Sequence, residues 1–284
     1  MVNTVFFGTH QFSIFALQVL KNNPNINLVA VVTTTDKKIG RDQTLTASPV
    51  KLWAIENNVK VIELSKSQGL STKTLALNDL GVISYFGYLI PKNIIDKFNL
   101  GILNIHPSLL PDYKGAAPLE WALLNGENKT GVTLIKINEK FDKGEIIDQF
   151  ETNLDYSRSK GEIYKDLFTK GAELLQNNLD AYITGNATLK PQKKSGKLAP
   201  MLTKQDGFID LLSTDENLLK RKILALNPWP STYTTLQNIA DFKKLKPLKN
   251  ADLKIQILDS DLKKLKPEGK NVMNWEEFKN GYLI

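Results

Sequence analysis

Residues 101–118 read GILNIHPSLLPDYKGAAP and decide how the fold is interpreted. The first six of these residues are apolar apart from Asn104 and His106, which is typical of a buried strand that carries a few polar side chains near its end. Pro107 follows at once and cannot donate a ladder hydrogen bond, so the strand should stop there and give way to the stiff loop SLLP. In open α/β sheets, ligands bind beyond the carboxyl ends of the strands. This loop is therefore a candidate functional site.

The chain on both sides of this stretch alternates apolar runs with helical patterns. Strands are expected at 4–8, 27–34, 60–64, 81–87, 131–138 and 144–153, and helices at 11–23, after Ser48-Pro49, near 71–79, from Pro91, at 117–125 and from 159 to 185. A polar loop is expected at 36–48, and a loop of about five residues should join the last two strands. Alternation of strands and helices predicts an α/β fold, with a Rossmann-like, mostly parallel sheet covered by helices.

Three regions are expected along the chain. Residues 1–188 form the large α/β domain. Residues 189–206 contain two prolines, a glycine and little periodicity, which favours a linker. Residues 207–284 should form a small basic domain: a capping box from Ser213 to Glu216 predicts a helix that stops at Asn227-Pro228, and short β-like stretches follow. We expect this domain to be β-rich.

The composition excludes several classes of protein. The chain has no cysteine, so disulfides, cysteine-bound zinc and thiol nucleophiles are excluded. Its two histidines, His10 and His106, are too few for a multi-histidine metal site, and we expect no metal. The start of the chain lacks the pattern of a signal peptide, and no apolar run reaches membrane-spanning length. We therefore expect a soluble, cytoplasmic protein without a membrane partner.

The net charge of +7 is concentrated at one end of the chain. Residues 189–284 contain 18 lysines and arginines against 11 acidic residues, which accounts for the whole excess. This asymmetry predicts contact with a polyanion, nucleic acid before membrane, although a solvated lysine-rich surface is the alternative. Lysine outnumbers arginine 34 to 3, so planar bidentate contacts are left to Arg41, Arg158 and Arg221.

The polar side chains of the opening stretch suggest a chemistry. Residues two apart in a strand point to the same side, so Asn104 and His106 can face one reacting centre. Asparagine can donate to an oxygen that gains negative charge, and histidine can take a proton near neutral pH, as acyl-type transfer requires. Asp142, in the loop KFDKGE, is the best-placed carboxylate. The residues alone leave a structural alternative open, in which all three serve turns and packing.

Several longer segments carry a resemblance to a known family. They are VFFGT, TDKKIGRDQTLTASPVKLWA, YFGYLIP, GILNIHPSLLPDYKGAAP, TGVTLIKINEKFDKGEI, LNPWP and KPEGKNVMNWEEFKNGY. With them the sequence resembles the methionyl-tRNA formyltransferases, folate-dependent enzymes that transfer a formyl group from 10-formyltetrahydrofolate to the amino group of methionine on initiator tRNA, for translation initiation. The central block and the Asp142 loop are shared with glycinamide ribonucleotide and sugar-amine formyltransferases. The SPVK loop, NPWP and the PEGK-to-EEF close are more particular to the tRNA enzymes.

The resemblance implies roles for the catalytic residues. Asn104 would polarise the formyl oxygen and hold the tetrahedral intermediate. His106 would stabilise charge and assist proton transfer, and Asp142 would position His106 or a relay water. The nucleophile would be the α-amine of the substrate, so no serine or cysteine nucleophile is needed. Residues 1–188 would then be the formyltransferase catalytic domain.

The resemblance also implies binding residues. The folate co-substrate would contact Ser108, Leu109, Leu110 and Pro111, the backbone of Phe86, Gly87, Tyr88, Leu89, Ile90 and Pro91, and the 139–144 loop. Initiator tRNA would contact Arg41 together with Lys37, Lys38 and Lys51, through phosphate contacts that weaken with salt. No metal or nicotinamide is implied, and a monomer is expected.

Some positions depart from the family pattern. His10 stands where the family has a proline, and Asp112 and Lys114 stand where arginines are usual. The C-terminal domain lacks about two strands of the usual OB-type barrel, so a reduced barrel is expected. Two alternatives therefore stay open: a formyltransferase acting on a nucleotide-sugar or other small amine, and a catalytically idle RNA-binding relative.

Overall fold

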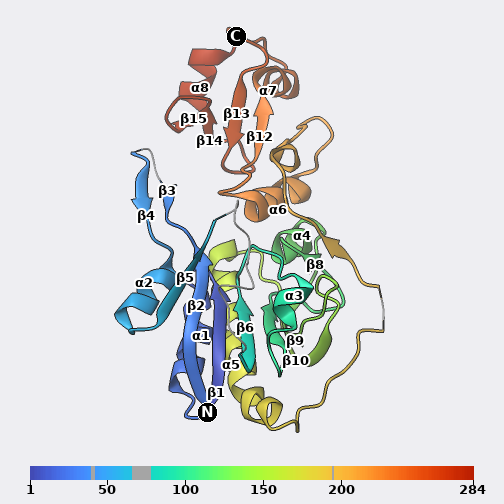
Figure 1. Cartoon of the computed structure of the whole chain (residues 1–284). Coiled ribbons are helices and arrows are strands. Elements are labelled where there is room, and N and C mark those ends of the chain that lie inside the picture. The colour runs from blue at the N-terminus through green and yellow to red at the C-terminus, as the bar shows by residue number, and fades with distance from the viewer. Residues whose placement is uncertain (40–41, 66–77, 194) are drawn as a thin grey trace. The chain divides into compact units, whose positions relative to one another are not determined.

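The computed structural model describes residues 1–39, 42–65, 78–193 and 195–284 (Figure 1). Its residues gather into two compact units. The first unit contains Met1–Pro118, Lys129–Asn153 and Gly161–Ala199, and the second contains Leu119–Asn128, Leu154–Lys160 and Pro200–Ile284. Most of the helix expected near 71–79 lies outside the described residues.

A seven-stranded sheet forms the centre of the first unit (Figure 1). Its strands are β1 (Val2–Gly8), β2 (Ile26–Thr34), β5 (Lys60–Leu64), β6 (Leu80–Ser84), β7 (Ile102–His106), β9 (Lys129–Lys136) and β10 (Glu145–Asn153), in the order β10-β9-β7-β6-β1-β2-β5. The strands from β5 to β7 pair in parallel, whereas β9 runs antiparallel to both β7 and β10. The predicted α/β fold with a mostly parallel sheet is confirmed.

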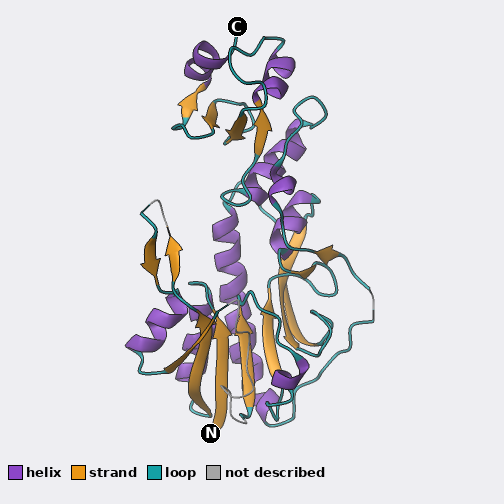
Figure 2. Ribbon diagram, turned by 45° about the horizontal axis from the view of Figure 1, so that its top comes forward, coloured by secondary structure: helices purple, strands orange, loops and turns teal. Residues whose placement is uncertain are grey.

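Helices of the first unit follow the strands as the sequence predicts (Figure 2). They are α1 (Ser13–Asn22), α2 (Pro49–Glu56), α3 (Lys92–Ile95) and α5 (Lys160–Ile183), of which the first residue of α5 belongs to the second unit. The Ser48 side chain accepts a hydrogen bond from the backbone N–H of Lys51, and Pro49 occupies the first helical position, so the predicted N-terminus of α2 is confirmed. In the described parts of the chain, no helix combines the length and apolar character needed to cross a membrane.

The alternation of side chains along β7 determines which face carries the polar groups. Ile105 packs against Gly171 of α5, on one face of the sheet. Ile102 belongs to a buried cluster on the other face, together with Phe7 of β1 and Ile94 of α3. Asn104 and His106 alternate with Ile105 and therefore lie on the face away from α5.

Two predicted loops of this unit differ from the structure. Residues 36–48, expected as a polar loop, contain the antiparallel strands β3 (Lys37–Ile39) and β4 (Thr44–Thr46), in which Lys37 pairs with Thr46. The β-branched threonines of β4 explain the extended backbone. Between β9 and β10 the chain makes a longer loop than expected, from 137 to 144, because Lys136 already pairs with Glu145.

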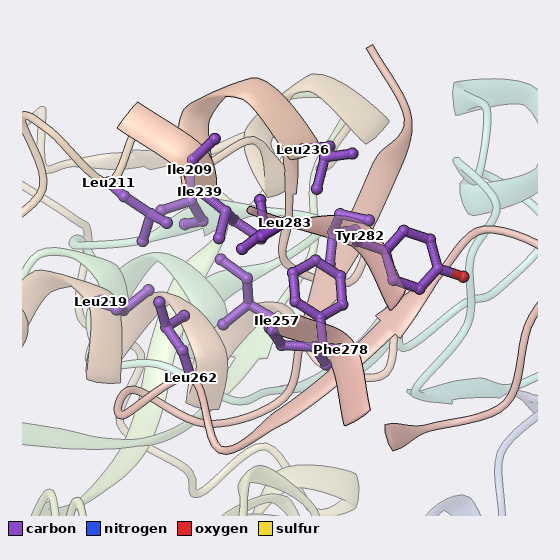
Figure 3. Packing of buried hydrophobic residues seen from close by; sticks show 13 residues of the cluster. Ile209, Leu211, Leu219, Leu236, Ile239, Ile257, Leu262, Phe278, Tyr282 and Leu283 are labelled. Carbon is purple, nitrogen blue, oxygen red and sulfur yellow. The ribbon is translucent and has the colours of Figure 1, made fainter. Parts of the chain in front are cut away.

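The second unit contains a small antiparallel sheet. Its elements are α4 (Pro118–Leu124), η1 (Lys204–Gly207), α6 (Glu216–Leu226), β12 (Tyr233–Thr235), α7 (Leu236–Lys243), β13 (Lys254–Ile257), β14 (Lys264–Pro267), β15 (Met273–Asn274) and α8 (Trp275–Tyr282). The strands pair in the order β12-β13-β14-β15. Figure 3 shows the core, in which Phe278 and Ile257 are fully buried beside Leu236 and Ile239. The predicted β-rich C-terminal region is confirmed, and its four strands are one fewer than in an OB barrel.

The helix starts in this unit correct the sequence prediction. The predicted capping box from Ser213 to Glu216 is wrong: Asp215 is the N-cap of α6 and accepts from the backbone N–H of Leu218. The Ser213 hydroxyl instead donates to Asp210 within the preceding turn. The sequence also missed α7 and α8, although Thr235 caps the first and a capping box from Asn274 to Glu277 opens the second.

The close packing of α5 on β7 predicts a steric requirement for glycine at position 171. A Cβ there would lie 2.3 Å from Cγ2 of Ile105. The steric cost of the added methyl group in Gly171→Ala is about 1–3 kcal/mol. Alanine gains at most about 1 kcal/mol over glycine in a helix, so we expect a net loss of stability of the first unit. Differential scanning fluorimetry should show a lower thermal midpoint.

A matched control exists in the same helix. A Cβ at Gly161 would meet no atom within 4 Å. Gly161→Ala should therefore leave the midpoint unchanged or raise it slightly. Equal midpoints for Gly171→Ala and Gly161→Ala would contradict the packing of α5 on β7.

Candidate active site

Strand β7 places Asn104 and His106 in the interior of the sheet. It lies between β6 and β9, where Asn104 pairs with Ile83 and Ile135, and His106 pairs with Thr133. His106 is buried and Asn104 is half-buried. Within the described residues the Asn104 amide makes no hydrogen bond, so it can donate to a ligand.

The His106 ring is held at both nitrogens. Its Nε2 lies 3.0 Å from the carbonyl oxygen of Tyr113, and its Nδ1 lies 3.6 Å from Oδ2 of Asp142. Because a carbonyl oxygen can only accept, Nε2 is the donor in the first contact. The Tyr113 carbonyl group and the Asp142 carboxylate therefore fix the orientation of the ring.

Asp142 is fixed by backbone from a distant part of the chain. Its side chain is buried, and its Oδ2 accepts a hydrogen bond of 3.0 Å from the backbone N–H of Gly115. Gly115 adopts φ 137°, and a Cβ there would lie 2.1 Å from the carbonyl oxygen of Ala199. The 113–115 turn thus supplies one backbone group to His106 and one to Asp142. The structure brings the three predicted catalytic residues together at the carboxyl end of β7.

The SLLP loop is held by a threonine that the sequence did not indicate. The Thr133 hydroxyl, on β9, donates to the carbonyl oxygen of Ser108 (2.6 Å) and accepts from the backbone N–H of Leu110 (3.1 Å). Gln149 on β10 donates to both Thr133 Oγ1 (2.9 Å) and the carbonyl oxygen of Leu110 (2.7 Å). Ser108 and Leu110 are buried, whereas Leu109 and Pro111 are half-buried. These hydrogen bonds therefore fix the shape of the loop.

The second predicted co-substrate segment follows β6. Ile90 is buried, Phe86 and Tyr88 are half-buried, and Gly87, Leu89 and Pro91 are exposed. The Phe86 ring packs edge-on against Phe7 of β1, with 5.7 Å between ring centroids. Since β6 and β7 are parallel neighbours, this segment begins at the same sheet edge as the loop that follows His106.

The predicted tRNA contacts differ in their surroundings. Lys37 and Lys38 are exposed on β3, and Arg41 lies outside the described residues. Lys51, on α2, instead pairs with Asp36 at 2.7 Å and with Glu63 at 2.9 Å. The hydrogen bond that Lys51 donates to Asp36, followed by the one that it donates to Glu63, raises the pKa of Lys51. Through these two ion pairs, Lys51 connects α2 to Asp36, which directly precedes β3, and to Glu63 on β5.

Comparison with known proteins identifies the family. A family model described as formyl transferase matches residues 2–179. The methionyl-tRNA formyltransferase of Clostridioides difficile is 38% identical over 239 residues, which cover 83% of this chain and 77% of the relative. This chain belongs to the methionyl-tRNA formyltransferase family. The methionyl-tRNA formyltransferase of Bacillus licheniformis is 32% identical over 99% of this chain and 95% of its own length.

Solved structures show the same fold at lower identity. The N-formyltransferase from Helicobacter canadensis, in complex with folinic acid and dTDP-3-aminofucose, superposes with a TM-score of 0.61 at 22% identity, over 79% of this chain and 80% of that one. A 4-N formyltransferase from Francisella tularensis gives a TM-score of 0.65 at 19% identity, over 82% and 92%. At these identities the likeness shows the formyltransferase fold alone.

The hydrogen bonds of Thr133 predict a specific effect on the SLLP loop. Thr133→Val keeps the shape of the side chain but leaves the backbone groups of Ser108 and Leu110 without their partner, at a cost of about 1–3 kcal/mol. We expect the KM for the formyl donor to rise about 5- to 140-fold, because each 1.4 kcal/mol corresponds to a factor of ten.

Thr130, which is buried on the same strand, gives the control. Its hydroxyl makes no hydrogen bond within the described part of the chain. Thr130→Val should leave the KM for the formyl donor unchanged. A normal KM for Thr133→Val would show that Thr133 does not shape the donor site.

Proposed function

We propose that this formyltransferase transfers the formyl group of 10-formyltetrahydrofolate to the α-amino group of methionyl-initiator tRNA, for translation initiation. The observation that carries this proposal is the arrangement of Asn104, His106 and Asp142 at the end of β7, in a chain that is 38% identical to a methionyl-tRNA formyltransferase over 83% of its length. Sugar N-formyltransferases share the fold at 22% identity. They support the reaction class and not the choice of amine.

The geometry supports a division of roles in the transfer. The α-amine uses its lone pair to form the new bond to the formyl carbon, and the bond from that carbon to the folate nitrogen breaks. The Asn104 amide donates to the formyl oxygen as negative charge grows there. His106, oriented by Tyr113 and Asp142, would stabilise the developing charge and assist the transfer of the proton that the amine loses to the departing nitrogen.

The residues present fit a formyl donor of this kind. Asn104 offers an amide without a partner in the described chain, and the 108–111 loop is fixed before binding. The backbone of 86–91 and of the 139–144 loop would wall the pteridine. In the described part of the chain, no three histidine, cysteine or acidic side chains gather into a possible metal site. A metal-free reaction remains a prediction.

For the RNA partner we propose the β3–β4 hairpin. Lys37 and Lys38 are exposed on β3 and make no ion pair with the described residues, and Arg41 lies between the two strands in sequence. The excess positive charge of residues 189–284 adds a less specific attraction. We propose that the protein acts as a cytoplasmic monomer.

Replacement of Asn104 tests the chemistry. We expect Asn104→Ala to lower kcat for formylation of methionyl-tRNA about 100- to 1,000-fold, because a donor to the developing oxyanion is lost. The circular dichroism spectrum and thermal midpoint should stay those of the parent protein. Asn153→Ala, at the exposed end of β10, serves as the control and should retain full activity.

The same assay separates the competing functions. Parallel reactions should contain methionyl-initiator tRNA or a nucleotide-linked amino sugar, each with 10-formyltetrahydrofolate. Formylation of the sugar amine alone would exclude the tRNA function in favour of the small-amine alternative. Binding of tRNA without formylation of either amine would identify an idle RNA-binding relative.

The lysines of β3 predict a salt-dependent contribution to RNA binding. Lys37→Ala combined with Lys38→Ala should weaken binding of methionyl-tRNA and make the slope of log K against log salt shallower by about 1 to 2, because up to two phosphate contacts are lost. Fluorescence anisotropy over a range of salt concentrations measures both effects. Lys165→Ala, an exposed lysine on α5, should change neither quantity. An unchanged slope in the double variant would place the RNA elsewhere.

A further inference from the structure

The segment expected to be a linker lies along the first unit. Residues 190–193 and 195–199, called the strap below, follow α5 in the chain. The backbone of Lys190 exchanges two hydrogen bonds of 2.8 Å with Ile146 of β10. At its other end, β11 (Leu198–Ala199) pairs in parallel with β8 (Lys114–Gly115). The described strap residues are therefore paired at both ends, with β10 and with β8.

One side chain of the strap holds the loop that carries Asp142. The Gln192 amide nitrogen donates to the carbonyl oxygens of Asp142 (2.9 Å) and Gly144 (2.8 Å). These two carbonyl groups flank the turn at residue 143, so a single amide closes the turn from outside. Gln192 is half-buried, which partly shields both hydrogen bonds from water.

The Asp142 loop needs such support because its backbone is constrained. Asp142 adopts φ 48°, in the left-handed region that residues with a Cβ rarely occupy. At Gly144 a Cβ would lie 1.9 Å from the carbonyl oxygen of Lys136. Backbone conformations of this kind persist when surrounding contacts fix them. Gln192 donates its two hydrogen bonds to the carbonyl groups of Asp142 and Gly144, which are the two residues with this constrained backbone.

The strap also holds the turn that faces Asp142. The Lys114 ammonium donates to the carbonyl oxygen of Ser195 at 3.1 Å, and the backbone N–H of Lys197 donates to Oδ1 of Asp112 at 2.8 Å. Burial lowers the pKa of Lys114, with a further contribution from the charge of Lys143. The 113–115 turn supplies the backbone partners of His106 and Asp142, so the strap contacts both segments that orient the predicted catalytic residues.

We propose that Gln192 is a positioning residue for formyl transfer: it fixes the 142–144 turn so that the Asp142 carboxylate faces His106. This inference rests on the proposed role of Asp142 in the reaction. Gln192 acts through Asp142 and makes no contact with the reacting atoms. Loss of its amide should therefore change the rate of the chemical step and leave the binding of methionyl-tRNA unchanged.

Replacement of Gln192 measures this effect. We expect Gln192→Ala to lower kcat about 10- to 100-fold, since a small misplacement of a catalytic group has an effect of that size. The KM for methionyl-tRNA should change less than twofold. Gln192→Glu keeps the length of the side chain but turns the donor into a charged acceptor beside two carbonyl oxygens, so it should lose at least as much activity. Wild-type kcat in Gln192→Glu would overturn the proposal.

A double-mutant cycle separates positioning from general structural support. Asn tolerates the left-handed backbone, so Asp142→Asn removes the charge while preserving the turn. In the Asp142→Asn background, Gln192→Ala should lower the remaining kcat less than twofold. An equal fold-loss in both backgrounds would show that Gln192 acts independently of Asp142, and would overturn the proposal. Lys193→Ala, the exposed neighbour in the strap, should leave kcat unchanged.

A measurement without turnover keeps the two proposals distinct. Hydrogen–deuterium exchange of peptides covering 137–145 should be faster in Gln192→Ala than in the parent protein, and unchanged in Lys193→Ala. Unchanged exchange in Gln192→Ala would overturn the positioning role even if activity falls. Full activity of Asp142→Asn together with faster exchange in Gln192→Ala would instead reject the proposed catalytic role of Asp142.

Discussion

The contact between the Asp142 carboxylate, the His106 ring and the Gly115 N–H is the constraint on which the site depends. Both side chains are almost fully buried, with exposed fractions of 8% and 5%. Burial of a carboxylate without hydrogen-bond or charged partners costs a large free energy. Each favourable electrostatic contact of a buried carboxylate is in turn stronger than the same contact in water. Three segments must therefore meet closely: the end of β7, residues 113–115 and the 137–144 loop. The close approach of Gly115 to Ala199 and of Gly144 to Lys136 follows from that requirement.

Local patterns in the sequence predicted the frame of this arrangement. Alternating apolar runs and helical periodicity predicted the α/β class, and the period of two along β7 placed Asn104 and His106 on one side, opposite Ile105. These features depend on neighbours within a few residues and are visible in the sequence. The proximity of Asp142 is of another kind. From the residues alone it was one candidate carboxylate in a turn, and its place beside His106 followed from the family resemblance.

The supporting residues were not predictable because they act across long separations. Thr133 reaches the SLLP loop only because β9 pairs antiparallel to β7, and no local pattern distinguishes it from Thr130 on the same strand. Gln192 lies in a stretch whose prolines and weak periodicity predict a linker, and that pattern gives no sign of its hydrogen bonds to Asp142 and Gly144, some 50 residues away in the chain. In the second unit, Asp215 rather than Ser213 caps α6, since the Ser213 hydroxyl is already used within its own turn. In each case the partners of the side chain come together only in the folded chain.

The lysines of this chain show why charge count alone cannot assign the RNA contact. Lys51 is neutralised by two carboxylates, whereas Lys243 lies 5.1 Å from the centroid of the Trp275 ring and Lys249 lies 4.2 Å from that of Tyr282. An aromatic ring restrains the ammonium group without cancelling its charge, so less side-chain entropy is lost when a phosphate binds. The lysines of the second unit can therefore attract a polyanion, but as point charges they discriminate poorly between sequences. Selection of the correct tRNA is therefore better assigned to the first unit, which contains both the exposed β3–β4 hairpin and the predicted catalytic residues of the seven-stranded sheet and its loops.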